Sequence, residues 1–408
     1  MSDGRREKVR ELAIVGLVSA GHFWSHFFTL AIPTALPLIR SDLGASNVSL
    51  GMVMAAFALM AAAWQFPMGV LSDRYGARVF LVGGLAIESL AMFSQSLAPA
   101  VPVMVAIALV MGIADSVFHP ADYTVLTAKI RQPWLGRAYA VHTFSGFLGF
   151  AAAPTVMSLL IAYGNWRQAL AVVGAAGFAT ALVLLASGKL LSGISYPPKR
   201  AAGSAAGGVA SLLLSPPLLI MFLFYVVATF SSNGLQNFGN SALIALYDLD
   251  IVGANTALAA FLWGTAIGVL GGGLVADSMK RFDAIATVCY LIAGVLLCLI
   301  GIAALPYAGI VAALFFTGFM LGAVMPARDM MVRTVTPPGS IGKAFGYVSS
   351  GFGVGGVIGP LVYGSMMDFS MPQLLFFVSA GMMLATIAVA LLASYVARRT
   401  GFRMQPAG

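Results

Sequence analysis

The sequence has 408 residues, of which 60% are hydrophobic and only 9% are charged. A soluble globular protein carries about 25% charged residues, so this composition excludes a chain that keeps its surface in water. The formal net charge of +8 does not indicate a nucleic-acid partner, because the basic residues gather in loops on one side of a predicted membrane topology.

Apolar segments long enough to cross a bilayer follow one another along the whole chain. A transmembrane helix needs about 20 predominantly apolar residues. Twelve segments meet this requirement, which predicts an all-α membrane protein with the lipid bilayer as its surroundings. The predicted helices span residues 11–39, 48–71, 79–97, 102–128, 137–163, 166–188, 217–246, 252–276, 284–304, 307–334, 342–366 and 373–396.

The basic residues are distributed unevenly over the predicted loops. Lys and Arg accumulate in cytoplasmic loops of membrane proteins. If both termini are cytoplasmic, 19 of the 22 Lys and Arg residues lie on the cytoplasmic side, while Arg40 and Arg167 face outward and Arg328 lies within a span. We therefore expect a multi-pass protein of the inner (plasma) membrane, with a cytoplasmic N-terminus (1–10) and a cytoplasmic tail (397–408).

The two halves of the chain repeat each other. Residues 189–216 form the predicted cytoplasmic linker between six helices in residues 11–188 and six in residues 217–396. Six landmark residues of the first half recur 206 positions later, which predicts two pseudo-symmetric six-helix bundles. The pairs are Gly112 and Gly318, Pro120 and Pro326, Ala121 and Ala327, Gly136 and Gly342, Ala138 and Ala344, and Pro154 and Pro360.

The loop after the second predicted helix carries a family motif. It reads Gly69-Val-Leu-Ser-Asp73-Arg74-Tyr-Gly76-Ala-Arg78. This stretch resembles the signature of the major facilitator superfamily between helices 2 and 3. The resemblance implies the major facilitator fold, with a substrate path between two halves that work by alternating access. It also implies that Gly69, Asp73, Arg74, Gly76 and Arg78 form a conformational latch on the cytoplasmic side.

Shorter motifs resemble the fosmidomycin-resistance branch of this superfamily. The first predicted helix carries Ser19-Ala-Gly-His22 followed by Pro37, and the fourth carries Phe118-His119-Pro120. This resemblance implies efflux of a small phosphonate.

Ionisable residues gather in the first and fourth predicted helices, which line the central path in the family. Such residues are costly inside a membrane and are candidate functional sites. His22 and His26 share one helix face because they are four residues apart, and Asp115, His119 and Asp122 share another. Histidine titrates near physiological pH, and a carboxylate in a low-dielectric site can exchange protons. We expect Asp115, His119, His26 and Asp122 to carry protons, with structural hydrogen bonds or an ion pair as the alternative.

An anion site is expected around Arg328, whose guanidinium can hold a carboxylate or phosphonate with two hydrogen bonds. The alternative is a gate with Asp122, the repeat partner of Arg328. Asp329 is expected to be a poor partner, because adjacent residues on a helix point about 100° apart. His142 and Glu88 are expected in structural roles. The expected substrate-binding residues are Arg328, Asn233, Gln236, Asn237, His22 and Tyr123.

These features together predict a secondary active transporter that couples protons to a small organic anion. We expect a monomer without catalytic residues, cofactor or resident metal. The sequence contains no Gly-x-x-x-x-Gly-Lys-[Ser/Thr] motif, so ATP is not the expected energy source. The alternatives are efflux of an anionic or amphipathic drug, a divalent metal carrier that uses His22, His26, His119 and Asp115, and an intramembrane enzyme or solute receptor. The His22-Phe-Trp-Ser-His26 sequence lacks the Glu of a zinc hydrolase motif.

Overall fold

The computed structural model describes residues 3–191, 215–278, 281–336 and 341–399. The chain divides into two compact units, Met1–Arg200 and Ala201–Gly408, and each is described by itself. Residues 192–214 of the predicted linker and 400–408 of the predicted tail lie outside the described residues. No strand occurs in the described part of the chain.

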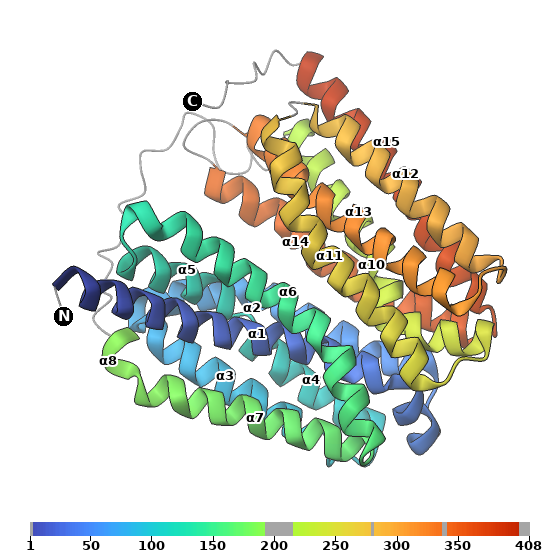
Figure 1. Cartoon of the computed structure of the whole chain (residues 1–408), viewed down its shortest axis with the longest axis horizontal. Helices are drawn as coiled ribbons and strands as arrows, with labels where there is room; N and C mark the ends of the chain where they lie inside the picture. The colour runs from blue at the N-terminus through green and yellow to red at the C-terminus, as the bar shows by residue number, and fades with distance from the viewer. Residues whose placement is uncertain (1–2, 192–214, 279–280, 337–340, 400–408) are drawn as a thin grey trace. The chain divides into compact units, whose positions relative to one another are not determined.

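Unit 1 is built from the helices coloured blue to green in Figure 1. They are α1 (Asp3–Leu43), α2 (Asn47–Tyr75), α3 (Ala77–Gln95), α4 (Val101–Asp115), α5 (Phe118–Lys129), α6 (Gln132–Ala162), α7 (Trp166–Ala186) and the short α8 (Gly188–Leu191).

Unit 2 is built from the helices coloured yellow-green to red in Figure 1. They are α10 (Pro216–Tyr247), α11 (Ile251–Ser278), α12 (Phe282–Gly301), α13 (Tyr307–Thr334), α14 (Ile341–Asp368) and α15 (Pro372–Arg399). Within the described residues, twelve helical segments of the two units are long and apolar enough to span a membrane. The predicted all-α membrane fold is therefore confirmed.

One of these spans, Val101–Lys129, is broken in its middle. Helix α4 ends at Asp115 and α5 begins at Phe118. Pro120 has no N–H to donate to the Ser116 carbonyl, and its ring crowds that carbonyl, which favours an interruption of the helix at this point. Asp115 therefore lies in α4, while His119 and Asp122 lie in α5, and Ser116 and Val117 between them keep right-handed helical backbone angles. That the three residues share a face stays a prediction.

The helices pack in the same pairs in both units. In unit 1, α1 packs on α6, α2 on α4 and α3 on α7, while in unit 2 α10 packs on α14, α11 on α13 and α12 on α15. Equivalent glycines make one of these contacts close. A Cβ on Gly112 would collide with the Phe57 carbonyl of α2, and a Cβ on Gly318 would collide with the Phe261 carbonyl of α11. Small residues allow membrane helices to approach closely, so the sequence repeat corresponds to a repeat in packing.

The predicted latch loop forms a tight turn between α2 and α3. Gly76 has a φ of 98° and donates its amide to the Ser72 carbonyl, 2.9 Å away. Glycine adopts this positive φ without steric cost. Arg78 donates from Nη2 to the Leu185 carbonyl near the end of α7, at 3.3 Å. The side chain of Asp73 lies outside the described residues.

Candidate functional site

All four histidines of the chain come together in unit 1. His22 and His26 lie on α1, His119 on α5 and His142 on α6. The ring centre of His22 is 4.0 Å from that of His142, 4.3 Å from that of His26 and 5.3 Å from that of His119. The contacts of α1 with α5 and α6 create this group. We call these four residues, together with Asp122, the histidine cluster.

One hydrogen bond fixes the tautomer of His22, the central histidine of the cluster. His22 Nδ1 lies 2.9 Å from the backbone carbonyl oxygen of His142. A carbonyl only accepts hydrogen bonds, so Nδ1 carries the proton and Nε2 presents a lone pair. His22 Nε2, His26 Nδ1 and both ring nitrogens of His142 are buried without a hydrogen-bond partner among the described residues.

Glycine at position 146 makes room for this arrangement. A Cβ at Gly146 would lie 2.6 Å from Cε1 of His22 and 3.0 Å from Cε1 of His26. Side-chain atoms do not approach so closely, so any larger residue on this turn of α6 would displace the two rings of α1.

Asp122 contributes a carboxylate to the same place. It is completely buried, and its Oδ2 lies 3.6 Å from Nε2 of His142. This separation suits an ion pair but exceeds an ordinary hydrogen bond. Both carboxylate oxygens lack a hydrogen-bond partner among the described residues. In unit 1, therefore, Asp122 pairs with His142.

Two more carboxylates lie close by. Asp115, at the end of α4, faces the Ser25 hydroxyl of α1 and interacts electrostatically with Asp122 and with Glu88 of α3. Glu88 is 0% exposed, and both of its carboxylate oxygens lack a hydrogen-bond partner in the described part of the chain. Sequence reasoning gave Glu88 a packing role, although it is the only acidic residue in α3.

His119 and Tyr123 are the exposed members of this region of α5. The Tyr123 ring centre is 5.6 Å from that of His142 and 5.1 Å from that of Tyr139. These side chains lie at the edge of the histidine cluster.

Unit 2 holds a different polar group around Arg328. Both Nε and Nη2 of Arg328 lie 2.9 Å from Oδ1 of Asp329. The Tyr225 hydroxyl donates to the same oxygen, at 2.9 Å. The expectation that Asp329 is a poor partner for Arg328 is wrong, because the long arginine side chain reaches around the helix to its neighbour.

Aromatic rings hold the Arg328 guanidinium in place. Its central carbon lies 4.6 Å from the ring centre of Tyr225 and 5.2 Å from that of Phe352. The Arg328 side chain is 15% exposed and that of Asp329 is 47% exposed. The bonds to Asp329 use Nε and Nη2, which leaves Nη1 outside this ion pair.

The predicted polar residues of α10 form hydrogen bonds within their own helix and to a neighbouring one. Asn237 donates to the carbonyl and to the side-chain oxygen of Asn233, at 3.0 and 2.9 Å. Asn233 is packed against Gly359 of α14, while Asn240 donates to Asn255 of α11 at 3.0 Å. Gln236 is half-buried. Hydrogen bonds within α10 and to α11 thus use part of the hydrogen-bonding capacity of Asn233, Asn237 and Asn240.

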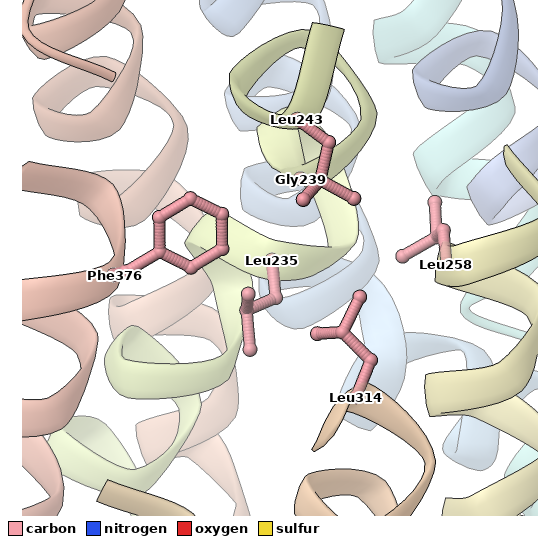
Figure 2. Close-up of a pocket in the computed structure, with 6 residues that line it drawn as sticks. All are labelled: Leu235, Gly239, Leu243, Leu258, Leu314 and Phe376. Carbon is pink, nitrogen blue, oxygen red and sulfur yellow. The ribbon is translucent and has the colours of Figure 1, made fainter. Parts of the chain in front are cut away.

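A small pocket in unit 2 has no polar lining. Figure 2 shows the side chains that surround it, which come from α10, α11, α13 and α15. They are Leu235, Gly239, Leu243, Leu258, Leu314 and Phe376. This lining offers no hydrogen bond or charge to an ionic solute, so the pocket is not a candidate anion site.

Comparison with known proteins identifies relatives along the whole chain. The family model described as Major Facilitator Superfamily matches residues 18–255 and 229–406. The fosmidomycin resistance protein of Escherichia coli K12 is 26% identical over 382 residues, which cover 90% of this chain and 89% of that protein.

Other relatives match over a shorter stretch. A probable sulfoacetate transporter of Cupriavidus necator is 30% identical over 42% of this chain and 40% of that protein. A cephamycin export protein of Amycolatopsis lactamdurans is 30% identical over 45% of this chain and 37% of that protein. These two matches span well under half the length of either relative.

Solved structures share the fold. A bacterial homologue of the human lysosomal transporter Spinster has a TM-score of 0.80 at 15% identity, over 98% of this chain and 99% of that one. A nucleoside transporter has a TM-score of 0.78 at 15% identity, over 93% of this chain and 99% of that one.

Proposed function

The chain belongs to the Major Facilitator Superfamily, and from this premise we propose that it is a secondary transporter that uses protons to move a small organic anion. Membership of this family makes the chain a multi-pass membrane transporter and not an enzyme. We further propose that it works by alternating access, as a monomer in the inner membrane, with both termini in the cytoplasm.

The observation that carries the anion proposal is the environment of Arg328. Its guanidinium is mostly buried, stacked on two aromatic rings and paired with Asp329. A guanidinium held in this way has a fixed fork for a planar or tetrahedral anion. We propose that the substrate binds to Nη1 and competes with Asp329 for the other nitrogens.

The histidine cluster and its neighbouring carboxylates supply the proton carriers in this proposal. Asp115, His119, His26 and Asp122 are grouped within unit 1, and several of their polar atoms have no hydrogen-bond partner among the described residues. Groups in this condition can gain or lose a proton without first breaking an internal hydrogen bond. We propose that Glu88 belongs to the same relay.

The other predicted site residues serve as substrate contacts or as the latch in this proposal. We propose that the substrate contacts His22, Tyr123, Asn233, Gln236 and Asn237 during the transport cycle. We also propose that the loop between α2 and α3 acts as a conformational latch. Its residues are Gly69, Asp73, Arg74, Gly76 and Arg78.

Relatives support an anionic substrate. Sulfoacetate, in the name of one relative, carries a carboxylate and a sulfonate. A second candidate function is efflux of an anionic or amphipathic drug, and it is favoured by the match to 89% of the fosmidomycin resistance protein. Uptake and efflux would use the same arginine, so the direction must be measured.

Transport in proteoliposomes tests the proposal. Purified protein would be reconstituted around a pH-sensitive dye and challenged with carboxylates, sulfonates, phosphonates, amphipathic cations and sugars. We expect a pH change with one class of anion. Arg328→Gln should lower the apparent affinity by roughly 30-fold, since removing one partner of a buried charge pair costs about 2 kcal/mol or more. Asp115→Asn should weaken the coupling of protons to the anion.

Arg333→Gln is the matched control, because Arg333 lies on the same helix but is exposed. It should transport like the wild type. A response to cations alone, or normal anion kinetics in Arg328→Gln, would refute the anion site. An unchanged pH dependence in Asp115→Asn would remove Asp115 from the proton relay.

A further inference from the structure

In the histidine cluster, several possible metal-ligand atoms lie close together, which proton transfer does not require. Two sets of three residues in unit 1 each bring one ligand atom per residue within 4.8 Å of the others. One set is His22, Asp122 and His142, all buried, and the other is His22, His26 and His119. Imidazole nitrogen and carboxylate oxygen are ordinary ligands of divalent transition-metal ions.

We propose that the buried set, His22, Asp122 and His142, binds one divalent transition-metal ion of the zinc type. The site draws its ligands from α1, α5 and α6. It shares His22 and Asp122 with the transport that we propose, but the ion itself need not be carried across the membrane.

The separation of the ligand atoms favours this set. Oδ2 of Asp122 and Nε2 of His142 are 3.6 Å apart. Two atoms that bind one ion tetrahedrally, at about 2.0–2.2 Å each, lie about 3.3–3.6 Å from one another. This pair is too distant for a normal hydrogen bond but has the spacing of two ligands of a shared ion.

The hydrogen bond of His22 also favours metal binding. Histidines that bind a metal usually donate their other ring N–H to a carbonyl or carboxylate, which fixes the ring and directs the free nitrogen at the ion. His22 makes this bond from Nδ1 to the His142 carbonyl, and its Nε2 is buried without a partner among the described residues. The backbone carbonyl of His142 therefore orients the His22 ring, and the side chain of the same residue, His142, is the second ligand.

Unsatisfied polar atoms provide a third argument. Both oxygens of Asp122 and both nitrogens of His142 are buried without hydrogen bonds in the described part of the chain. Buried polar groups are normally paired, and an unpaired one lowers stability. A bound cation would satisfy several of them at once, and the Asp122 carboxylate would offset part of its charge.

The donor set selects the class of ion. Calcium and magnesium prefer six or more oxygen ligands, so two imidazoles make them poor candidates. Zinc accepts nitrogen and oxygen in tetrahedral sites, and three protein ligands leave one position for water or a solute. We therefore use Zn²⁺ as the probe.

X-ray absorption on the whole protein tests the site directly. All four histidines of the chain belong to the histidine cluster, so imidazole scattering around zinc can come only from this group when the purification tag has no histidine. Protein stripped with a chelator and reloaded with Zn²⁺ should retain about one ion per chain through gel filtration. The zinc spectrum should show nitrogen and oxygen at about 2.0 Å with imidazole outer shells.

Variants identify the ligands. His22→Gln, His142→Gln and Asp122→Asn should each weaken Zn²⁺ binding by at least about 100-fold, and Zn²⁺ should no longer raise their melting temperature. His26→Gln and His119→Gln should retain binding within about threefold of the wild type. The control is Cys289→Ala with Cys298→Ala, because these free cysteines could also bind zinc as thiolates, and it should bind Zn²⁺ normally.

Three results would overturn the proposal: loss of zinc on gel filtration, a zinc spectrum without imidazole, or normal binding in the Asp122→Asn and His142→Gln variants. Loss of binding in His26→Gln and His119→Gln instead would assign zinc to the other set and refute the ligands named here. Zinc binding is measured without transport, so its failure leaves the proposed anion transport untouched, and the reverse also holds.

Discussion

Glu88 is fully buried on α3, and neither of its carboxylate oxygens has a hydrogen-bond partner among the described residues. A charged side chain at the centre of a membrane helix costs about 2.5–3.5 kcal/mol. We therefore expect Glu88→Gln, which keeps the shape and removes the ionisable group, to melt at or above the temperature of the wild type. Glu88→Ala removes the same group but leaves a cavity, so it should lower the free energy of unfolding by about 2 kcal/mol or more.

Thermal unfolding of the detergent-purified variants at pH 7 measures this difference at Glu88. The alanine variant is the control for loss of volume. If the glutamine variant melts as low as the alanine variant, the ionisable carboxyl group itself stabilises unit 1, contrary to the expectation.

Single residues show what spacing along a helix can and cannot predict. Four-residue spacing correctly placed His22 beside His26, whose ring centres are 4.3 Å apart. It could not bring in His142, because that contact depends on the packing of α6 on α1. Spacing also wrongly predicted that Asp329 is a poor partner for Arg328, since spacing gives the direction of each Cβ but not the reach of a long side chain.

At the scale of the helix, Pro120 and Pro326 occupy equivalent positions in the repeat but have different consequences. The span that contains Pro120 is broken at residues 116–117, whereas α13 runs unbroken through Pro326. Proline in a helix interior costs about 3 kcal/mol relative to alanine. We expect Pro326→Ala to raise the melting temperature, because α13 gains a hydrogen bond without changing direction.

Pro120→Ala should lower the melting temperature or leave it unchanged. A continuous helix would swing α5 and draw Asp122 away from His142, which offsets the gain of one hydrogen bond. Differential scanning calorimetry of the two variants, each compared with the wild type, measures this contrast. An equal rise in both would show that the break does not hold the histidine cluster in place.

Hydropathy predicted the spans well because their length and apolar character are set by the bilayer. It placed the start of the first helix at residue 11, whereas α1 begins at Asp3. Charged residues early in α1 carry no hydropathy signal. In the structure Glu11 accepts three hydrogen bonds of 2.9 Å from Arg131, from its backbone amide, Nε and Nη2. Nη1 of Arg131 also lies 3.3 Å from Oε2 of Glu7, which belongs to the segment that hydropathy missed. Hydropathy along the chain cannot predict such a contact between distant residues.

At the scale of the whole molecule, the constant offset of 206 residues predicted which helices are equivalent. It worked because the repeated residues are largely glycines and prolines that set helix approach, as Gly112 and Gly318 do in their two units. The polar residues follow no such repeat. The histidine cluster belongs to unit 1 and the Arg328 group to unit 2, so the offset predicted the scaffold of each unit but not its chemistry.

The orientation of the whole chain in the membrane is the remaining prediction. Because 19 of the 22 Lys and Arg residues fall on one side of the predicted topology, both termini should be cytoplasmic. The loop after α6 should then face outward and the loop before α6 inward. Tyr163, which is 88% exposed, and Gln132, which is also exposed, mark these two loops.

Cysteine labelling of the full chain tests this orientation. Cys289 and Cys298 would first be replaced by alanine, and Tyr163→Cys or Gln132→Cys would then be added singly. In intact cells a membrane-impermeant maleimide should label Tyr163→Cys within minutes and leave Gln132→Cys unlabelled until the membrane is permeabilised. Each variant is the control for the reactivity of the other, since both positions are exposed. The reverse pattern would invert the topology and place the basic loops outside, where the positive-inside rule does not allow them.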